Sequence, residues 1–249
     1  MLYECKNPAR CIVGVERVAW EGGTFEVEPR EYSSLAFRIG GTSAITVGEK
    51  TYYAGGGDIL YLPQGLAYRA EYTDTDMLAI HFVTAKNDTE PEIYTPRNTE
   101  QIYKAFISAH TLWQNKALGH EAYVLSQLYY ILGELWENEL KNILPEHFIR
   151  AMSYINAHYT DPDLSVERIC KNAAISQTNL RSLFRKYCQK TPVEYITRLR
   201  LEYARNLISC GRPVEDAALE SGFLDPKYFA RVVKKHFSCT PRELRSYGK

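Results

Sequence analysis

Two short segments near the carboxyl end place basic and hydroxyl side chains where one face of a helix would gather them. The first supplies Gln177, Thr178, Arg181, Ser182 and Arg185, and the second supplies Lys227, Ala230, Arg231 and Lys234. Arginine can fork onto guanine in the major groove, and serine or threonine can reach polar base edges or a thymine methyl group. The pattern predicts binding to double-stranded DNA, with Arg181 as the principal residue for base recognition. The alternative is that these cationic side chains only solvate an exposed helix.

A second set of candidate residues lies in the front part of the chain: Arg38, Tyr68, Tyr72 and His81. Alternate side chains of a strand face opposite sides, so Tyr68 and Tyr72 face inward if Arg69 faces water. Inside a barrel, tyrosine rings can stack on the apolar face of a sugar while a guanidinium bonds its hydroxyl groups. We therefore expect a small-molecule site, with a sugar as the favoured ligand. The alternative is that the tyrosines are core and Arg38 points into solvent.

The sequence lacks the side-chain arrangements of an enzyme or a cofactor site. Its six cysteines are scattered without a Cys-x-x-Cys pair, so neither a zinc site nor a disulfide framework is predicted. It contains no Ser/His/Asp arrangement, phosphate-binding glycine loop or metal cluster. We expect a protein that is not an enzyme and that uses no cofactor.

The DNA-binding candidates belong to a segment that is repeated within the chain. Residues 184–194 match residues 233–243 at an offset of 49, and three positions upstream match at an offset of 48. The one-residue difference falls after Gly222, inside a predicted turn, where it leaves the flanking helices in place. One helix-turn-helix unit is therefore used twice. Basic side chains on the matching helix of both copies favour DNA binding over simple solvation.

Capping residues predict where the helices of both copies begin. The predicted caps are Ser165, Ser176, Thr191, Asp225 and Thr240. Proline follows three of them directly, at a position where its missing N–H is not needed. Thr191 and Thr240 are also followed three residues later by glutamate, which is the capping-box pattern. A long helix over roughly residues 192–210 is expected to join the two units.

The front of the chain is strand-like from about residue 10 to residue 85, with glycine turns between runs of β-branched and aromatic residues. We expect an antiparallel β-barrel, with a polar linker at its end, over residues 1–97. Two helices are expected within residues 98–144, because apolar residues recur there at helical spacing. Their apolar stripes can form the seam with the barrel or a dimer surface, and we favour a mixture.

Charge is divided unevenly along the chain. The whole sequence is neutral, but residues 146–249 hold 18 Lys and Arg against 11 Asp and Glu, a net charge of +7. The remaining residues therefore carry −7, and a basic end fits contact with a polyanion. No apolar run reaches the ~18–20 residues that span a bilayer, and no signal-peptide pattern opens the chain. We expect a cytoplasmic protein without a membrane partner.

Residues 155–245 resemble the AraC/XylS family of bacterial transcription regulators. The most specific part of the resemblance is Gly222-Phe223-x-Asp225-x-x-Tyr228-Phe229. The resemblance implies two helix-turn-helix units, within residues 145–249, that enter successive major grooves on one side of the duplex. It assigns base contacts to Thr178, Arg181, Ser182, Lys227 and Arg231.

The resemblance has departures, and it extends less specifically into the front of the chain. Ala174, Gln189 and Ser238 stand where the family usually has glycine, which bears on turn geometry and stability. Residues 57–82 resemble the cupin-like barrel that some family members carry before helices for dimerisation. The metal-binding version of this barrel needs several histidines and a carboxylate. Only His81 of the six histidines lies in the strand region, so no metal is expected.

These observations predict a multi-domain α+β protein: an antiparallel barrel with two helices, followed by an all-α double helix-turn-helix domain. The leading hypothesis is a homodimeric, sequence-specific transcription activator that responds to a small molecule in the barrel, with RNA polymerase as a further expected partner. A second hypothesis replaces the small molecule by a protein partner of the front domain, which a barrel without a polar pocket would favour. A third, a barrel with catalysis of its own, lacks any supporting motif.

Overall fold

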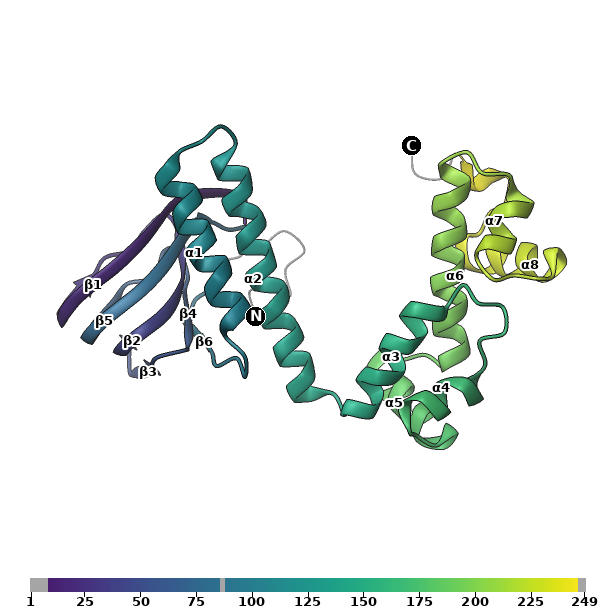
Figure 1. Cartoon of the computed structure of the whole chain (residues 1–249), viewed down its shortest axis with the longest axis horizontal. Coiled ribbons are helices and arrows are strands. Elements are labelled where there is room, and N and C mark those ends of the chain that lie inside the picture. The colour runs from purple at the N-terminus through teal and green to yellow at the C-terminus, as the bar shows by residue number, and fades with distance from the viewer. Residues whose placement is uncertain (1–8, 86–87, 246–249) are drawn as a thin grey trace. The chain divides into compact units, whose positions relative to one another are not determined.

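The computed structural model describes residues 9–85 and 88–245. The chain divides into two compact units, Met1–Asn142 and Ile143–Lys249. The first combines an antiparallel sheet with two helices, and the second consists of helices (Figure 1). The predicted α+β architecture is therefore confirmed. A further division of the first unit at residue 97 stays a prediction.

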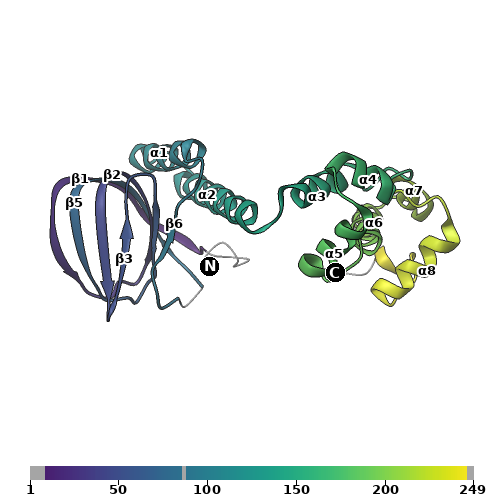
Figure 2. The same ribbon diagram turned by 90° about the horizontal axis from the view of Figure 1, so that it is seen from below.

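A six-stranded antiparallel sheet forms the front of the first unit. Its strands are β1 (Cys11–Val27), β2 (Ser33–Val47), β3 (Lys50–Ala54), β4 (Ile59–Leu62), β5 (Tyr68–Val83) and β6 (Glu92–Tyr94). Their order is β1-β5-β2-β4-β6, and β3 pairs with β2 beside this path. Figure 2 shows the sheet as strongly curved. Among the described residues no ladder joins β1 to β6, so the pairings form an open path without the closure of the predicted barrel.

The bend of the long strands depends on glycine. Register shifts interrupt the β2–β5 ladder on both sides of Gly40. The next residue, Gly41, has φ 71°, and a Cβ there would lie 2.0 Å from the carbonyl oxygen of Thr73. Glycine alone permits this approach. Because of the bend, Leu35 belongs to the hydrophobic cluster under the helices, whereas Ile45 of the same strand belongs to a separate cluster.

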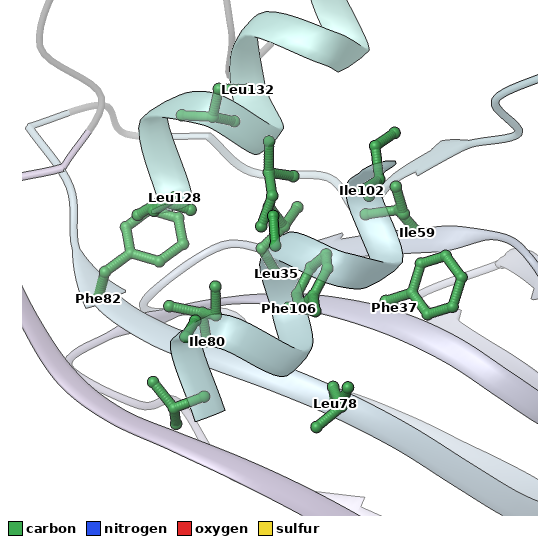
Figure 3. Packing of buried hydrophobic residues seen from close by; sticks show 14 of the residues in the cluster. Leu35, Phe37, Ile59, Leu78, Ile80, Phe82, Ile102, Phe106, Leu128 and Leu132 are labelled. Carbon is green, nitrogen blue, oxygen red and sulfur yellow. The ribbon is translucent and has the colours of Figure 1, made fainter. Parts of the chain in front are cut away.

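Helices α1 (Glu100–Asn115) and α2 (His120–Ile143) cover one face of the sheet. Ile102 and Phe106 of α1 and Leu128 of α2 are fully buried against this face (Figure 3). The strand residues beneath them are Leu35, Phe37, Ile59, Leu78, Ile80 and Phe82. Burying one such side chain contributes about 1.5–3 kcal/mol, so this layer holds the helices on the sheet. The apolar stripes of the two helices therefore form the predicted seam with the sheet.

The second unit contains six α-helices and a short 3-10 helix in the described residues. They are α3 (Glu146–His158), α4 (Val166–Ala173), α5 (Gln177–Cys188), α6 (Pro192–Ser209), α7 (Val214–Glu220), α8 (Pro226–Phe237) and the 3-10 helix Glu243–Arg245. Two hydrophobic clusters divide the unit, one per predicted copy. The linker helix α6 supplies Ile196 to the first cluster and Leu201, Ala204 and Ile208 to the second. Each copy therefore has its own core.

The caps lie where the sequence predicts them. The side chains of four caps accept a hydrogen bond from a backbone N–H in the first turn of their helices: Ser165, Ser176, Thr191 and Asp225. Thr191 and Glu194 complete a capping box. At Thr240 the backbone N–H donates to the Glu243 carboxylate at 2.7 Å. The described residues that follow form a 3-10 turn in place of the expected α-helix.

Three helices of the second unit end at a non-glycine residue in the left-handed region. These residues are Ala174 (φ 52°), Gln189 (φ 54°) and Ser238 (φ 58°). They are the positions at which the family resemblance implies glycine. A side chain in this conformation is disfavoured by about 1–2 kcal/mol, because Cβ crowds the following carbonyl oxygen. The departures from the family pattern therefore carry backbone strain.

We expect Ala174→Gly and Ser238→Gly each to raise the free energy of unfolding by about 0.5–1 kcal/mol, because relief of strain exceeds the added freedom of the unfolded chain. Urea unfolding followed by circular dichroism measures the change. The control is Ala157→Gly, an exposed position inside α3, where glycine should lower stability by up to about 1 kcal/mol. If Ala174→Gly and Ser238→Gly lower the free energy of unfolding as much as the control does, the proposed backbone strain is contradicted.

Cysteines and other metal-binding side chains are dispersed in the described residues. The cysteines found there, Cys11, Cys170, Cys188, Cys210 and Cys239, are free thiols, and Cys5 lies outside the described residues. No three His, Cys, Asp or Glu side chains in this part of the chain are placed to hold a metal ion. No helix within the same residues is both long and apolar enough to cross a membrane.

Candidate DNA-binding surface and ligand cavity

Helix α5 exposes one stripe of polar and cationic side chains. Its opposite face buries Leu180, Leu183 and Phe184 in the first cluster of the unit. The exposed stripe consists of Gln177, Thr178, Arg181, Ser182 and Arg185. These residues recur at helical spacing and so share one side of the helix. The Gln177 side chain donates to the Glu167 carboxylate of α4 at 2.9 Å, which ties the start of α5 to the preceding helix.

Helix α8 repeats this arrangement in the second copy. Phe229, Val233 and Phe237 are buried in the second cluster. The exposed stripe consists of Lys227, Ala230, Arg231 and Lys234. The Arg231 guanidinium lies 5.3 Å from the ring centroid of Tyr228, a cation–π contact that orients it. The structure therefore places every predicted DNA-contacting residue on the exposed face of α5 or α8.

The cations of both stripes are available to an anionic partner. The ion pairs found in the described residues of this unit involve other basic side chains: Arg150, Arg168, Arg205, Arg212 and His236. In the described part of the chain no carboxylate is paired with Arg181, Arg185 or Arg231. Charges without an internal partner are the ones that can displace counterions from phosphates.

A polar junction links the two helix-turn-helix copies. Arg200 of α6 donates from Nε to the carbonyl oxygen of Tyr159 at 2.6 Å and from Nη2 to that of Asp161 at 2.7 Å. Gly222, in the turn between α7 and α8, has φ 84°, and a Cβ there would lie 2.6 Å from the carbonyl oxygen of Thr160. The turn after α3, the linker helix and the second-copy turn thus meet at one point. We expect the relative placement of α5 and α8 to depend on this contact.

The first unit contains a cavity of about 640 Å³. Strands β1, β2, β4 and β5 line it together with residues 28–32, which join β1 to β2. Three of the four predicted ligand residues lie in the lining: Tyr68, Tyr72 and His81. The volume falls within the ~300–1,000 Å³ that small-molecule sites occupy.

Arg38 is not among the residues that line this cavity. Its guanidinium lies 5.6 Å from the Tyr72 ring centroid and donates to the carbonyl oxygen of Gly40 at 3.3 Å and to Thr75 Oγ1 at 3.4 Å. The side chain is 3% exposed, so the alternative that it points into solvent is also wrong. Burial lowers the pKa of Arg38. Arg38 supports Tyr72 from beside the cavity.

The arginine that lines the cavity is Arg30, which the sequence reasoning missed. Its guanidinium lies 5.2 Å from the ring centroid of Tyr32 and 5.5 Å from that of Tyr68, and it donates to the Tyr68 hydroxyl. Strand alternation gave no signal for it, because Arg30 lies in the loop between β1 and β2. A basic residue after Pro29 at the end of a long strand was the only clue.

Known proteins match the second unit of the chain. A helix-turn-helix domain family matches residues 169–247. The lactose operon transcription activator of Staphylococcus xylosus is 30% identical over 127 residues, which are 49% of this chain and 45% of that protein. The regulatory protein SoxS of Salmonella typhimurium is 30% identical over 95 residues, which are 38% of this chain and 88% of SoxS. The chain spans less than half the length of the first curated relatives it matches.

Solved structures give further matches. A transcriptional regulator with an AraC-type DNA-binding domain from Chromobacterium violaceum is 31% identical, with a TM-score of 0.38, and the match covers 40% of this chain and 89% of that one. The sequence relatives are transcription regulators, so the expectation that this chain is not an enzyme is confirmed. Since the match to SoxS covers most of that protein, the chain belongs to the AraC family of DNA-binding transcription regulators.

Proposed function

We propose that the chain activates transcription by placing α5 and α8 in two successive major grooves. The observation that carries this proposal is that two copies of one helix-turn-helix unit expose cations on the corresponding helix, with Arg185 and Lys234 at matched positions and no carboxylate partner in the described residues. Each helix has twelve residues, and an α-helix fits the major groove, which is about 12 Å wide. Three curated relatives are named as activators, which supports activation over repression.

The two stripes supply side chains for base edges and for phosphates. Thr178, Arg181 and Ser182 of α5 are the proposed base contacts in one groove. Lys227 and Arg231 of α8 are the proposed base contacts in the next. The proposed phosphate contacts are Gln177, Arg185 and Lys234. Because phosphate contacts position a protein while base contacts specify its site, the two groups should respond differently to substitution.

We expect Arg181→Ala and Arg231→Ala each to weaken binding to a selected DNA site by about tenfold to a hundredfold, since a good arginine–guanine pair contributes about 1–3 kcal/mol. Arg185→Ala should weaken binding to all sequences alike and reduce the salt dependence. The full chain is first used to select sites from random DNA, and fluorescence anisotropy then measures affinity at several salt concentrations.

The matched control is Lys104→Ala, which removes one exposed positive charge from α1. It should leave DNA affinity unchanged. Affinity that does not fall as salt rises would contradict phosphate contact. If Arg181→Ala and Arg231→Ala behave like the control, the assignment of α5 and α8 is wrong.

We further propose that a small-molecule effector occupies the cavity and alters DNA affinity. Arg30, Tyr68 and His81 in its lining support this over control by a protein partner, for which a front domain without a polar pocket is expected. A ligand that binds the folded state raises the melting temperature. The same ligand should then change the affinity for the selected DNA, and a ligand that stabilises without this change would contradict the coupling.

The same proposal includes a homodimer formed through α2. This helix keeps large side chains on its exposed side, among them Tyr123, Tyr130 and Leu140, which are 58%, 44% and 38% exposed. Sedimentation of the full chain, compared with a Tyr123→Ser/Tyr130→Ser variant, tests it, and a monomeric parent chain would contradict it. Contact with RNA polymerase stays a prediction.

A further inference from the structure

One side of the cavity is a wall of three aromatic rings. Trp20 and Phe25 stack with centroids 4.8 Å apart and an angle of 4° between their planes. Tyr72 lies against both, at centroid distances of 5.8 and 6.1 Å. All three line the cavity, and Trp20 is 41% and Phe25 38% exposed. Aromatic rings that line a cavity and keep exposed surface can stack on another flat ring.

The same cavity holds a cationic donor and a hydroxyl donor side by side. Arg30 lies over the rings of Tyr32 and Tyr68 and donates to the Tyr68 hydroxyl. Since that oxygen already accepts a bond, its own proton is free for a ligand. Burial raises the pKa of Tyr68 to about 12, so the hydroxyl keeps this proton at neutral pH. In the described part of the chain no carboxylate is paired with Arg30.

His81 adds a buried atom that lacks a partner. The residue is 8% exposed and its ring lies 4.9 Å from the ring of Tyr32. Its Nε2 is 3.7 Å from a carboxylate oxygen of Glu16, whereas its Nδ1 has no hydrogen-bond partner among the described residues. Buried polar atoms normally have one. A ligand in the cavity can supply it.

Three glutamates also line the cavity, Glu16, Glu26 and Glu28, and all three are exposed residues. Glu16 lies beside His81, whereas the Arg30 guanidinium and the Tyr68 hydroxyl form a pair of donors that no carboxylate of the described residues satisfies. Each hydroxyl of a neutral sugar brings a donor that needs an acceptor, whereas a carboxylate needs only donors. The end of the cavity at Arg30 and Tyr68 therefore fits a carboxylate group better than a hydroxyl group.

We propose that the cavity binds a small ring-bearing carboxylate, with its carboxylate at Arg30 and Tyr68 and its ring against Trp20, Phe25 and Tyr72. The proposal rests on the proposed effector function, because it names the ligand class of the same cavity. An aromatic acid and a sugar acid share this chemistry. A charge-assisted pair with a guanidinium is stronger than a neutral hydrogen bond, so the acid binds more tightly than its uncharged analogue.

Two matched pairs of probes test the proposal on the full chain: phenylacetate with 2-phenylethanol, and D-glucuronate with D-glucose. Thermal unfolding and titration calorimetry measure binding. We expect an acid of at least one pair to bind and its neutral partner to bind at least tenfold more weakly. The pair that responds identifies the kind of ring.

Variants separate the Arg30 contact from general charge. Arg30→Gln should weaken binding of the acid by about tenfold to a hundredfold. The control is Arg69→Gln, because Arg69 is exposed on β5 beside Glu71, at 3.1 Å, and outside the lining. It should leave binding unchanged.

The outcomes distinguish this inference from the proposed function. If the neutral probes bind as tightly as the acids, or if Arg30→Gln binds the acid as well as Arg69→Gln does, the carboxylate inference is overturned and the effector cavity stands. If none of the four probes binds at millimolar concentration, the carboxylate inference is overturned, whereas the effector role does not depend on these four probes. DNA binding by α5 and α8 is tested separately and survives either result.

Discussion

Gly222→Ala is expected to lower the free energy of unfolding of the second unit by about 3 kcal/mol or more. Two effects add at this position. A φ of 84° disfavours any residue with a Cβ by about 1–2 kcal/mol. In addition, the new Cβ would lie 2.6 Å from the carbonyl oxygen of Thr160 and 3.1 Å from Arg200 Nε. A backbone oxygen cannot rotate away, so the turn after α3 must shift.

The control that separates the two effects is Gly211→Ala in the same unit. Gly211 also has a positive φ, 95°, but a Cβ there meets nothing within 4 Å. It should therefore show only the conformational cost of about 1–2 kcal/mol. Urea unfolding of the full chain, followed through the helical circular dichroism signal, gives both values. Equal losses in the two variants would show that the approach to Thr160 contributes nothing.

Gly222→Ala should also weaken DNA binding, because Gly222 lies in the turn directly before α8 and the new Cβ pushes this turn and the turn after α3 apart. A variant that loses stability while keeping its affinity for the selected DNA would indicate that the turn can shift without moving the recognition helix.

The helices of the second unit were predictable because their signals are local. A cap such as Ser176 or Asp225 acts within three residues, and the buried spacing of Leu180 and Phe184 repeats within one turn. These features need no knowledge of distant parts of the chain. The same holds for the strand faces, since the alternation around Leu35 depends only on neighbouring residues. The local pattern was therefore enough to orient both stripes for which we propose DNA contact.

The cavity was less predictable because distant residues decide it. Alternation correctly places Arg38 inside, but Gly40 and Thr75 already receive its hydrogen bonds beside Tyr72. Arg30 reaches the cavity from a loop, where no periodicity exists to predict its direction. Register shifts on both sides of Gly40 in the β2–β5 ladder bend strand β2 just after Arg38. The pairing of distant strands, which no single segment encodes, therefore decides that Arg30 and not Arg38 lines the cavity.

The junction between the helix-turn-helix copies was hidden for the same reason. The sequence identifies Gly222 as a turn residue, but its closest neighbour, Thr160, lies far earlier in the chain. Arg200 likewise looks like one cation among several on the linker helix. Only its hydrogen bonds to the turn after α3 distinguish it.

In the proposed complex, α5 contacts one half of the DNA site and α8 the other half. The protein should therefore bind DNA carrying both half-sites more tightly than DNA carrying one. Arg200→Ala is expected to remove most of this difference in affinity. The guanidinium makes two hydrogen bonds to the carbonyl oxygens of Tyr159 and Asp161, at 2.6 and 2.7 Å. Bonds from a charged donor contribute about 1.5–3 kcal/mol each. Without them the two copies lose a fixed spacing, and the second binding event is no longer favoured by a high effective concentration. We expect the ratio of the two affinities to fall by about tenfold or more.

Anisotropy with two DNA duplexes measures this ratio, one carrying the full selected site and one with a single half replaced. The control is Arg205→Ala, which removes a positive charge from the same helix at an ion pair with Glu202. Because both variants lose one charge, any uniform loss of phosphate attraction cancels in the ratio. Arg200→Lys should recover part of the difference in affinity, since an ammonium can still donate to one of the carbonyl oxygens. If Arg200→Ala and Arg205→Ala give the same ratio, the packing around α6 alone sets the spacing of the recognition helices, and the hydrogen bonds of Arg200 serve only stability.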